Sequence, residues 1–222
     1  MRKRAVLFDF DFTLADSTLG AVECVNSALA AMALPRAAPN AIRATIGLGL
    51  AATLARLTGI TDPALAETFS RNFVKRADMR MVELTTIFPE VAPTLDRVKA
   101  AGISTGIIST KFRYRIEAIL RRDRLSSAFD VIVGGEDVTR HKPDPEGLVK
   151  ALGKLEVRAV DCLYVGDHPV DAQAAEAAGI PFAAVLTGVA VPSDFEPWPA
   201  TMFLDSLLDL APLLGLRPAM AF

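Results

Sequence analysis

The sequence contains few of the residues that mark several common classes of protein. Only two of its 222 residues are cysteine and only two are histidine. Cys24 and Cys162 lie far apart, and the histidines show no ligand spacing, so neither a disulfide framework nor a zinc site is indicated. We expect reduced thiols and a cytoplasmic protein, although the sequence alone leaves a single disulfide open.

Long runs of one kind of residue are also missing. No apolar run approaches the ~20 residues that a membrane-spanning helix needs. Residues 2–4 are basic, but the apolar stretch that follows them is too short for the core of a signal peptide. The formal net charge is −2. We therefore expect neither a membrane nor a nucleic acid as partner.

The composition is that of an ordinary globular protein, with 51% apolar and 23% charged residues. A chain of this length can form one large core or a core with a smaller insert. Residues 17–83 contain no strand pattern. Their periodicity and their capping residues, such as Asp62 before Pro63, predict helices over 18–32, 40–45, 51–57 and 64–81.

From Pro89 onward, helices alternate with short apolar strands. Together with the first strand, the expected strands are 5–8, 103–108, 129–133, 162–165, 182–186 and 201–204, and the last helix is expected over 206–214. This order predicts an α/β fold: a Rossmann-like parallel sheet flanked by helices, formed by residues 1–16 and 84–222. Residues 17–83 would be a helical domain inserted after the first strand. Such sheets bind ligands beyond the carboxyl ends of their strands.

Two carboxylates follow the first strand. Asp9 and Asp11 come directly after the apolar run from Ala5 to Phe8, and residues i and i+2 of a strand point to the same side. Like charges held so close raise one another's pKa unless a cation or a proton intervenes. The pair therefore indicates a metal site or acid/base chemistry. The alternative is that both residues only cap a loop or a helix.

Further polar residues follow later strands. Ser109 and Thr110 come after the second core strand and are expected to open a helix whose free N–H groups can bind phosphate oxygens. Lys142 lies in a loop before Pro143, and Gly166-Asp167 begins a phrase that ends in Asp171. Four aspartates meeting one lysine would leave negative charge that is costly to desolvate, and Mg²⁺, which prefers oxygen ligands, would offset it. A plain helix N-terminus, a serine N-cap and a surface lysine are the structural alternatives.

This ordered set of motifs resembles the haloacid dehalogenase-like hydrolase superfamily over nearly the whole chain. The resemblance implies that Asp9 is the nucleophile that accepts a phosphoryl group and that Asp11 is the general acid and base. It implies that Lys142 holds Asp9 ionised and balances charge on the phosphoryl group. The implied site residues are: catalytic, Asp9, Asp11 and Lys142; phosphate-binding, Thr13, Ser109, Thr110 and Lys142; metal-binding, Asp9, the Phe10 carbonyl, Asp11, Asp167 and Asp171.

The same resemblance gives the helical insert the position of a cap. Arg43 could contact a second anionic group of a substrate, and Gly47 and Gly49 could belong to a substrate-facing loop or to a structural turn. Lys111 and Arg113 are expected on a solvated helix face rather than on substrate. We expect no catalytic role for the two histidines, His141 and His168.

The resulting hypothesis is a Mg²⁺-dependent phosphatase that acts on a small phosphorylated metabolite. The phrases S-T-K at 109–111 and K-P-D-P at 142–145 resemble the phosphoglycolate phosphatase-like branch. The alternatives are an inorganic pyrophosphatase or a sugar-phosphate phosphomutase of the same superfamily, or a non-catalytic binding protein on this fold. The sequence does not decide between a monomer and a homodimer.

Overall fold

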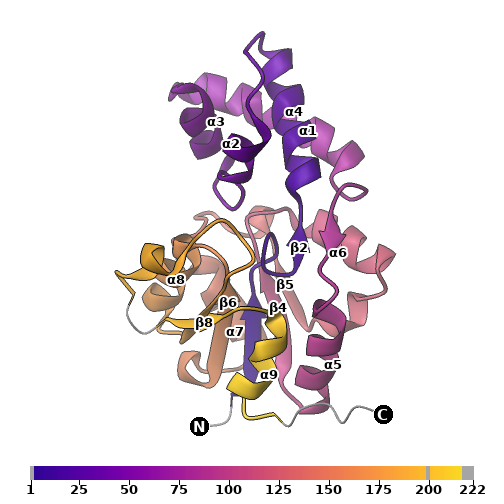
Figure 1. The fold of residues 1–222 in the computed structure, drawn as a ribbon, viewed down its shortest axis with the longest axis vertical. Coiled ribbons are helices and arrows are strands. Elements are labelled where there is room, and N and C mark those ends of the chain that lie inside the picture. The colour runs from indigo at the N-terminus through magenta and orange to yellow at the C-terminus, as the bar shows by residue number, and fades with distance from the viewer. Residues whose placement is uncertain (1–2, 199–200, 217–222) are drawn as a thin grey trace. The chain divides into compact units, whose positions relative to one another are not determined.

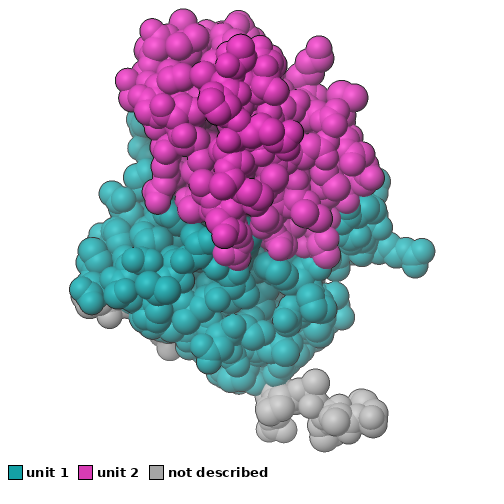
Figure 2. Space-filling view, turned by 45° about the horizontal axis from the view of Figure 1, so that its top comes forward, with its two compact units in different colours: residues 1–14, 87–222 teal, residues 15–86 magenta. Residues whose placement is uncertain are grey.

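The computed structural model describes residues 3–198 and 201–216. The structure divides into two compact units: unit 1 consists of Met1–Leu14 and Ile87–Phe222, and unit 2 of Ala15–Thr86. Figure 2 shows unit 1 in teal and unit 2 in magenta.

Unit 1 is organised around a six-stranded sheet with the order β5-β4-β1-β6-β7-β8, in which every pair of neighbours is parallel (Figure 1). This confirms the predicted fold class. The first strand of the chain lies in the interior of the sheet because its four residues are apolar and all are fully buried. The strands are β1 (Ala5–Phe8), β4 (Ser104–Ile108), β5 (Val131–Val133), β6 (Cys162–Gly166), β7 (Phe182–Val185) and β8 (Met202–Leu204).

Helices cover both faces of this sheet. Ala5 and Leu7 of β1 share one core cluster with Leu148 and Ala175, which come from two of the helices. Phe8 points to the opposite face and is also fully buried. The α-helices of unit 1 are α5 (Val91–Ala100), α6 (Arg113–Arg122), α7 (Glu146–Leu155), α8 (Pro169–Ala178) and α9 (Leu210–Leu213). Its 3₁₀ turns are Ser126–Ala128, Gly135–Asp137, Ala159–Asp161, Pro192–Phe195 and Leu207–Asp209.

Unit 2 is helical, and its own apolar residues form its core. Leu29, Ile42, Leu54 and Phe69, one from each helix, are fully buried in one cluster. The Asp62 side chain accepts a hydrogen bond from Leu65 N at 2.9 Å, which is the predicted cap of the last helix. The helices are α1 (Thr18–Ala31), α2 (Pro39–Arg43), α3 (Leu50–Thr58) and α4 (Pro63–Arg80).

The structure also differs from the sequence-based expectation in two places. Two strands of two residues each, β2 (Ala15–Asp16) and β3 (Thr86–Ile87), pair with each other and were not predicted, because two residues are too few to show a strand period. The helix expected over 206–214 is a 3₁₀ turn followed by the single turn of α9.

Cys24 and Cys162 form no disulfide within the described residues, and both side chains are buried. Within residues 3–198 and 201–216, no helix is long and apolar enough to cross a membrane.

Candidate active site

The carboxyl ends of three neighbouring strands supply the centre of the site. Asp9 follows β1, Ser109 follows β4 and Asp167 follows β6, and β1 pairs with both of the other two strands. Because all three strands run in the same direction, their ends meet at one edge of the sheet. All three side chains are buried.

Three of the predicted carboxylates form one close group. Asp9, Asp167 and Asp171 each present an oxygen, and these oxygens lie within 4.8 Å of one another. Asp171 reaches the group from the first turn of α8, three residues beyond its N-cap. The meeting of the two distant motifs, which the sequence could only suggest, is therefore present in the structure.

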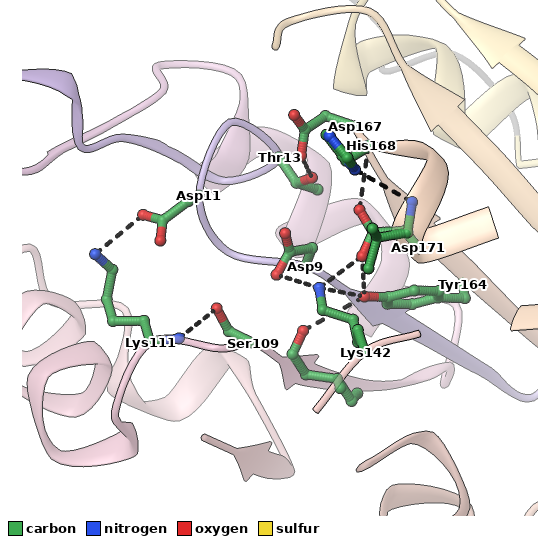
Figure 3. Close-up of polar contacts among 12 residues, drawn as sticks. Asp9, Asp11, Thr13, Ser109, Lys111, Lys142, Tyr164, Asp167, His168 and Asp171 are labelled. Atoms are coloured by element: carbon green, nitrogen blue, oxygen red, sulfur yellow. Dashed lines mark hydrogen bonds and ion pairs between the residues drawn. The ribbon is translucent and has the colours of Figure 1, made fainter. Parts of the chain in front are cut away.

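Lys142 lies between two of these acids (Figure 3). Its Nζ is 2.9 Å from Asp9 Oδ1 and 2.6 Å from Asp171 Oδ1, and only 6% of its side chain is exposed. Lys142 is thus a buried cation, and the alternative of a surface lysine beside a turn is excluded.

Asp171 is occupied on both of its oxygens. Oδ1 accepts hydrogen bonds from Lys142 Nζ and from the Tyr164 hydroxyl at 2.9 Å, and Oδ2 accepts one from His168 N at 3.2 Å. These contacts suit a residue that orients Lys142. The hydroxyl of Tyr164, a fully buried residue of β6, also lies 3.1 Å from Lys142 Nζ. Sequence analysis missed Tyr164, and its one signal was a phenol inside an otherwise apolar strand.

Burial and crowding shift the ionisation of the group. Burial raises the pKa of Asp9 to about 7; the Lys142 ammonium opposes this shift and the Asp171 carboxylate adds to it. Burial also raises the pKa of Asp167 well above its ordinary value, and Asp171 and Asp9 add to that shift. Burial alone would lower the pKa of Lys142, but Asp171 and Asp9 outweigh it and raise the pKa.

The charge balance of this group fits a divalent cation. Three carboxylates face one ammonium, which leaves two uncompensated negative charges when all four groups are ionised. Asp9 Oδ1 is buried and receives no well-aligned hydrogen bond from the described residues, since its Lys142 contact is an ion pair. Mg²⁺ prefers oxygen ligands, and this group offers only oxygens, one of them without a well-aligned hydrogen bond. Asp9 and Asp167 would hold the ion.

The Phe10 carbonyl, the other predicted ligand, accepts a hydrogen bond from Leu14 N at 2.9 Å. A carbonyl oxygen has two lone pairs, so this bond does not prevent it from also meeting a cation. Thr13 is fully buried, and its hydroxyl lies 3.4 Å from Asp167 Oδ1, which ties the loop after β1 to the acid after β6.

Asp11 lies outside the group of three. Its Oδ1 is 3.1 Å from Lys111 Nζ, and Figure 3 shows its carboxylate turned toward Lys111 and away from Asp9. Lys111 was expected on a solvated helix face. Instead, only 6% of its side chain is exposed, because the chain is still in a turn at this point and α6 begins two residues later.

Ser109 is not the cap of a helix. Its hydroxyl accepts a hydrogen bond from Lys111 N at 3.2 Å, and half-buried Thr110 lies between them. The expectation that Ser109 and Thr110 open the helix is wrong, because the N-cap of α6 is Phe112. At that N-terminus, Arg113 N already donates to Glu136 Oε2 at 2.8 Å.

The two histidines lie at a helix cap and in a loop. His168 Nδ1 accepts a hydrogen bond from Val170 N at 3.2 Å and so caps α8. His141 is an exposed loop residue. Arg113 pairs with Glu117 and Asp137 rather than with any acid of the site.

Fold and site together define a class: a parallel α/β protein with a buried cluster of three carboxylates and one lysine at the carboxyl ends of its strands. Residues 6–185 match the family model of the haloacid dehalogenase-like hydrolases. The chain belongs to this family.

Similar proteins agree with this assignment. A phosphoglycolate phosphatase of Xanthomonas campestris pv. campestris is 33% identical over 91% of this chain and 92% of its own length. One from Salmonella typhimurium is 32% identical over 96% and 93%. A crystal structure from Bacteroides fragilis, assigned provisionally to the haloacid dehalogenase-like hydrolases, has a TM-score of 0.91 and 42% identity, covering 94% of this chain and all of that one. The expectation of a phosphoric monoester hydrolase is confirmed by the family and these relatives.

Proposed function

We propose that the chain is a Mg²⁺-dependent phosphatase that hydrolyses a small, phosphoglycolate-like phosphomonoester through an aspartyl-phosphate on Asp9. The observation that carries the proposal is the position of Asp9, buried at the end of β1 with Lys142 at 2.9 Å and in one group with Asp167 and Asp171. The substrate class follows the relatives, which are phosphoglycolate phosphatases.

The first half of the reaction transfers the phosphoryl group to the enzyme. A carboxylate oxygen of Asp9 attacks phosphorus, the bond from phosphorus to the ester oxygen breaks, and Asp11 gives that oxygen a proton. Lys142 balances negative charge on the phosphoryl oxygens and keeps Asp9 ionised. Bound Mg²⁺ would supply further charge compensation at the phosphoryl oxygens.

The second half releases phosphate. Asp11 takes a proton from a water molecule, the water oxygen attacks phosphorus, and the bond to Asp9 breaks so that the carboxylate is restored. The Ser109 hydroxyl, with Thr110 beside it, is assigned to binding the phosphoryl oxygens. Thr13 is assigned to holding Asp167 in place.

Unit 2 contains the whole of the predicted insert, residues 17–83. We assign it the role of a cap that selects the substrate, since the shared machinery of a fold does not set specificity. We also propose a cytoplasmic location, which suits Cys24 and Cys162 as buried cysteines outside any disulfide.

The test is phosphate release from 2-phosphoglycolate, a hexose phosphate and pyrophosphate, each with Mg²⁺ and with a chelator. We expect turnover of 2-phosphoglycolate that requires Mg²⁺, and a phosphorylated peptide containing Asp9 after an acid quench. Preferential turnover of pyrophosphate would favour a pyrophosphatase, and transfer of phosphate within a hexose without its release would favour a mutase. No turnover of any compound would favour a binding protein.

A further inference from the structure

Gly188 lies against the Asp167 carboxylate. It belongs to the loop that follows β7, the strand beside β6. A Cβ at position 188 would lie 2.1 Å from Asp167 Oδ2 and 3.0 Å from its Cγ, whereas real Cβ contacts under 3.0 Å essentially do not occur. The backbone of Gly188 is not in the left-handed region. Space, and not backbone conformation, is therefore what requires glycine here.

The other side of the same carboxylate faces the loop after β1. Thr13 Oγ1 lies 3.4 Å from Asp167 Oδ1. The two loops are also joined directly, because the Thr187 hydroxyl donates a hydrogen bond to the Phe12 carbonyl. Thr13 thus contacts one oxygen of the Asp167 carboxylate and Gly188 lies against the other, so turning the carboxylate away from position 188 also moves Oδ1 from its place beside Thr13.

We propose that Gly188 is a positioning residue for Asp167: the absent side chain leaves the space in which Oδ2 lies, and this holds the carboxylate at the metal-binding distance from Asp9. The proposal rests on the proposed function in that the ion is taken to be Mg²⁺. It adds a residue outside the four motifs of the site and assigns a role to the loop after β7.

The expected consequence of a methyl group at position 188 is a displaced metal ligand in a folded protein. Going from 2.1 Å to an allowed 3.0 Å requires a shift of roughly 1 Å, and a site loses function when its groups move by more than about 0.5 Å. Mg²⁺ needs near-ideal octahedral geometry, whereas Ca²⁺ accepts longer and more variable distances. We therefore expect Gly188→Ala to weaken Mg²⁺ binding about 10- to 100-fold and Ca²⁺ binding much less.

The experiment measures Mg²⁺ and Ca²⁺ affinity by isothermal titration calorimetry for the wild type, Gly188→Ala and Gly153→Ala. Gly153 lies within α7, and a Cβ there would meet nothing within 4 Å, so this control should bind both ions as the wild type does. Wild-type Mg²⁺ affinity in Gly188→Ala would overturn the proposal. Failure of the wild type itself to bind Mg²⁺ would count against the proposed function and not against the role of Gly188.

A double-mutant cycle tests whether Gly188→Ala acts through the Asp167 carboxylate, and it requires no bound ion. Asp167→Ala removes the carboxylate and leaves only its Cβ, 3.2 Å from a Cβ at position 188, so adding Gly188→Ala to this variant should lower the unfolding midpoint in denaturant much less than it does in the wild type. If Gly188→Ala alone does not fold but the double variant does, the overlap with Asp167 is demonstrated. Equal losses of stability with and without the Asp167 carboxylate, or a double variant that does not fold, would show that position 188 acts through something else.

Discussion

Asp9 and Asp11 are two residues apart on one loop, yet the fold gives them different surroundings. Asp9 is crowded by Asp167 and Asp171, shares Lys142 with Asp171 and has its pKa raised to about 7 by burial. Asp11 has Lys111 as an ion-pair partner of its own. The first environment favours an Asp9 carboxylate that binds a cation or attacks an electrophile. The second keeps the Asp11 carboxylate apart from the group of three acids and beside an ammonium that Asp9 does not share.

The largest expected effect on turnover comes from removing the charge of Asp9. Asp9→Asn keeps the shape of the side chain but removes the nucleophile, so we expect turnover to fall about 10⁴-fold or more. The fold should be kept, because the change removes a buried charge. Phosphate release and circular dichroism check the two expectations. Activity near that of the wild type would contradict the assignment of Asp9 as nucleophile.

Asp11→Asn should give a smaller loss with a different signature. General acid catalysis contributes about 10²- to 10⁴-fold, and it matters most for a leaving group that needs a proton. We expect a loss of about 10³-fold with an alkyl phosphate and a clearly smaller loss of kcat/KM with p-nitrophenyl phosphate, whose phenolate leaves without help. Steady-state kinetics on the two esters measure the ratio. Equal losses on both esters would mean that Asp11 does not protonate the leaving group.

The two lysines should differ in how much each contributes to the stability of the folded protein. Lys142→Met leaves a buried group of three acids without its cation, and breaking a buried pair in this way costs about 3 to 5 kcal/mol. Lys111→Met removes the ammonium beside one acid, Asp11, so we expect a smaller loss. Denaturant unfolding with a chelator present measures both. A larger loss of unfolding free energy in Lys111→Met than in Lys142→Met would contradict this expectation.

The sequence predicted the strands of the six-stranded sheet and the meeting of Asp9 with Asp167, because both acids follow strands that a parallel α/β order brings together. It could not predict that Asp11 turns toward Lys111, because the alternation of a strand no longer holds once β1 has ended at Phe8. That rule placed both acids at one point. The loop instead passes through Phe12, whose φ is 59°, a left-handed conformation.

The contacts of Tyr164 and Gly188 could not be predicted from the sequence for another reason. A tyrosine in an apolar strand and a glycine in a loop are common in any fold, and their roles arise from neighbours that are distant in the chain. Tyr164 meets Asp171 across the start of α8, and Gly188 lies against Asp167 from the loop after the adjacent strand. Only the three-dimensional structure shows these distances.

The smallest expected effect is a pH dependence of stability that separates Asp9 from ordinary carboxylates. Because its pKa is about 7 in the folded protein and near 3.8 otherwise, the folded state holds a proton between these values that the unfolded chain has released. Stability therefore decreases as the pH rises through this window, and the raised pKa of Asp167 acts in the same direction. We expect the chelated wild type to lose stability from pH 5 to pH 8.

Asp9→Asn provides the control for this pH effect, since it removes the titrating group and keeps the rest of the site. The difference in unfolding free energy between this variant and the wild type should grow from pH 5 to pH 8 in a chelator and be reduced by saturating Mg²⁺, which binds the deprotonated carboxylates. An identical pH dependence in both proteins would mean that Asp9 is ionised throughout this pH range. The two acids would then differ only in position, and the crowding by Asp167 and Asp171 would have no energetic consequence.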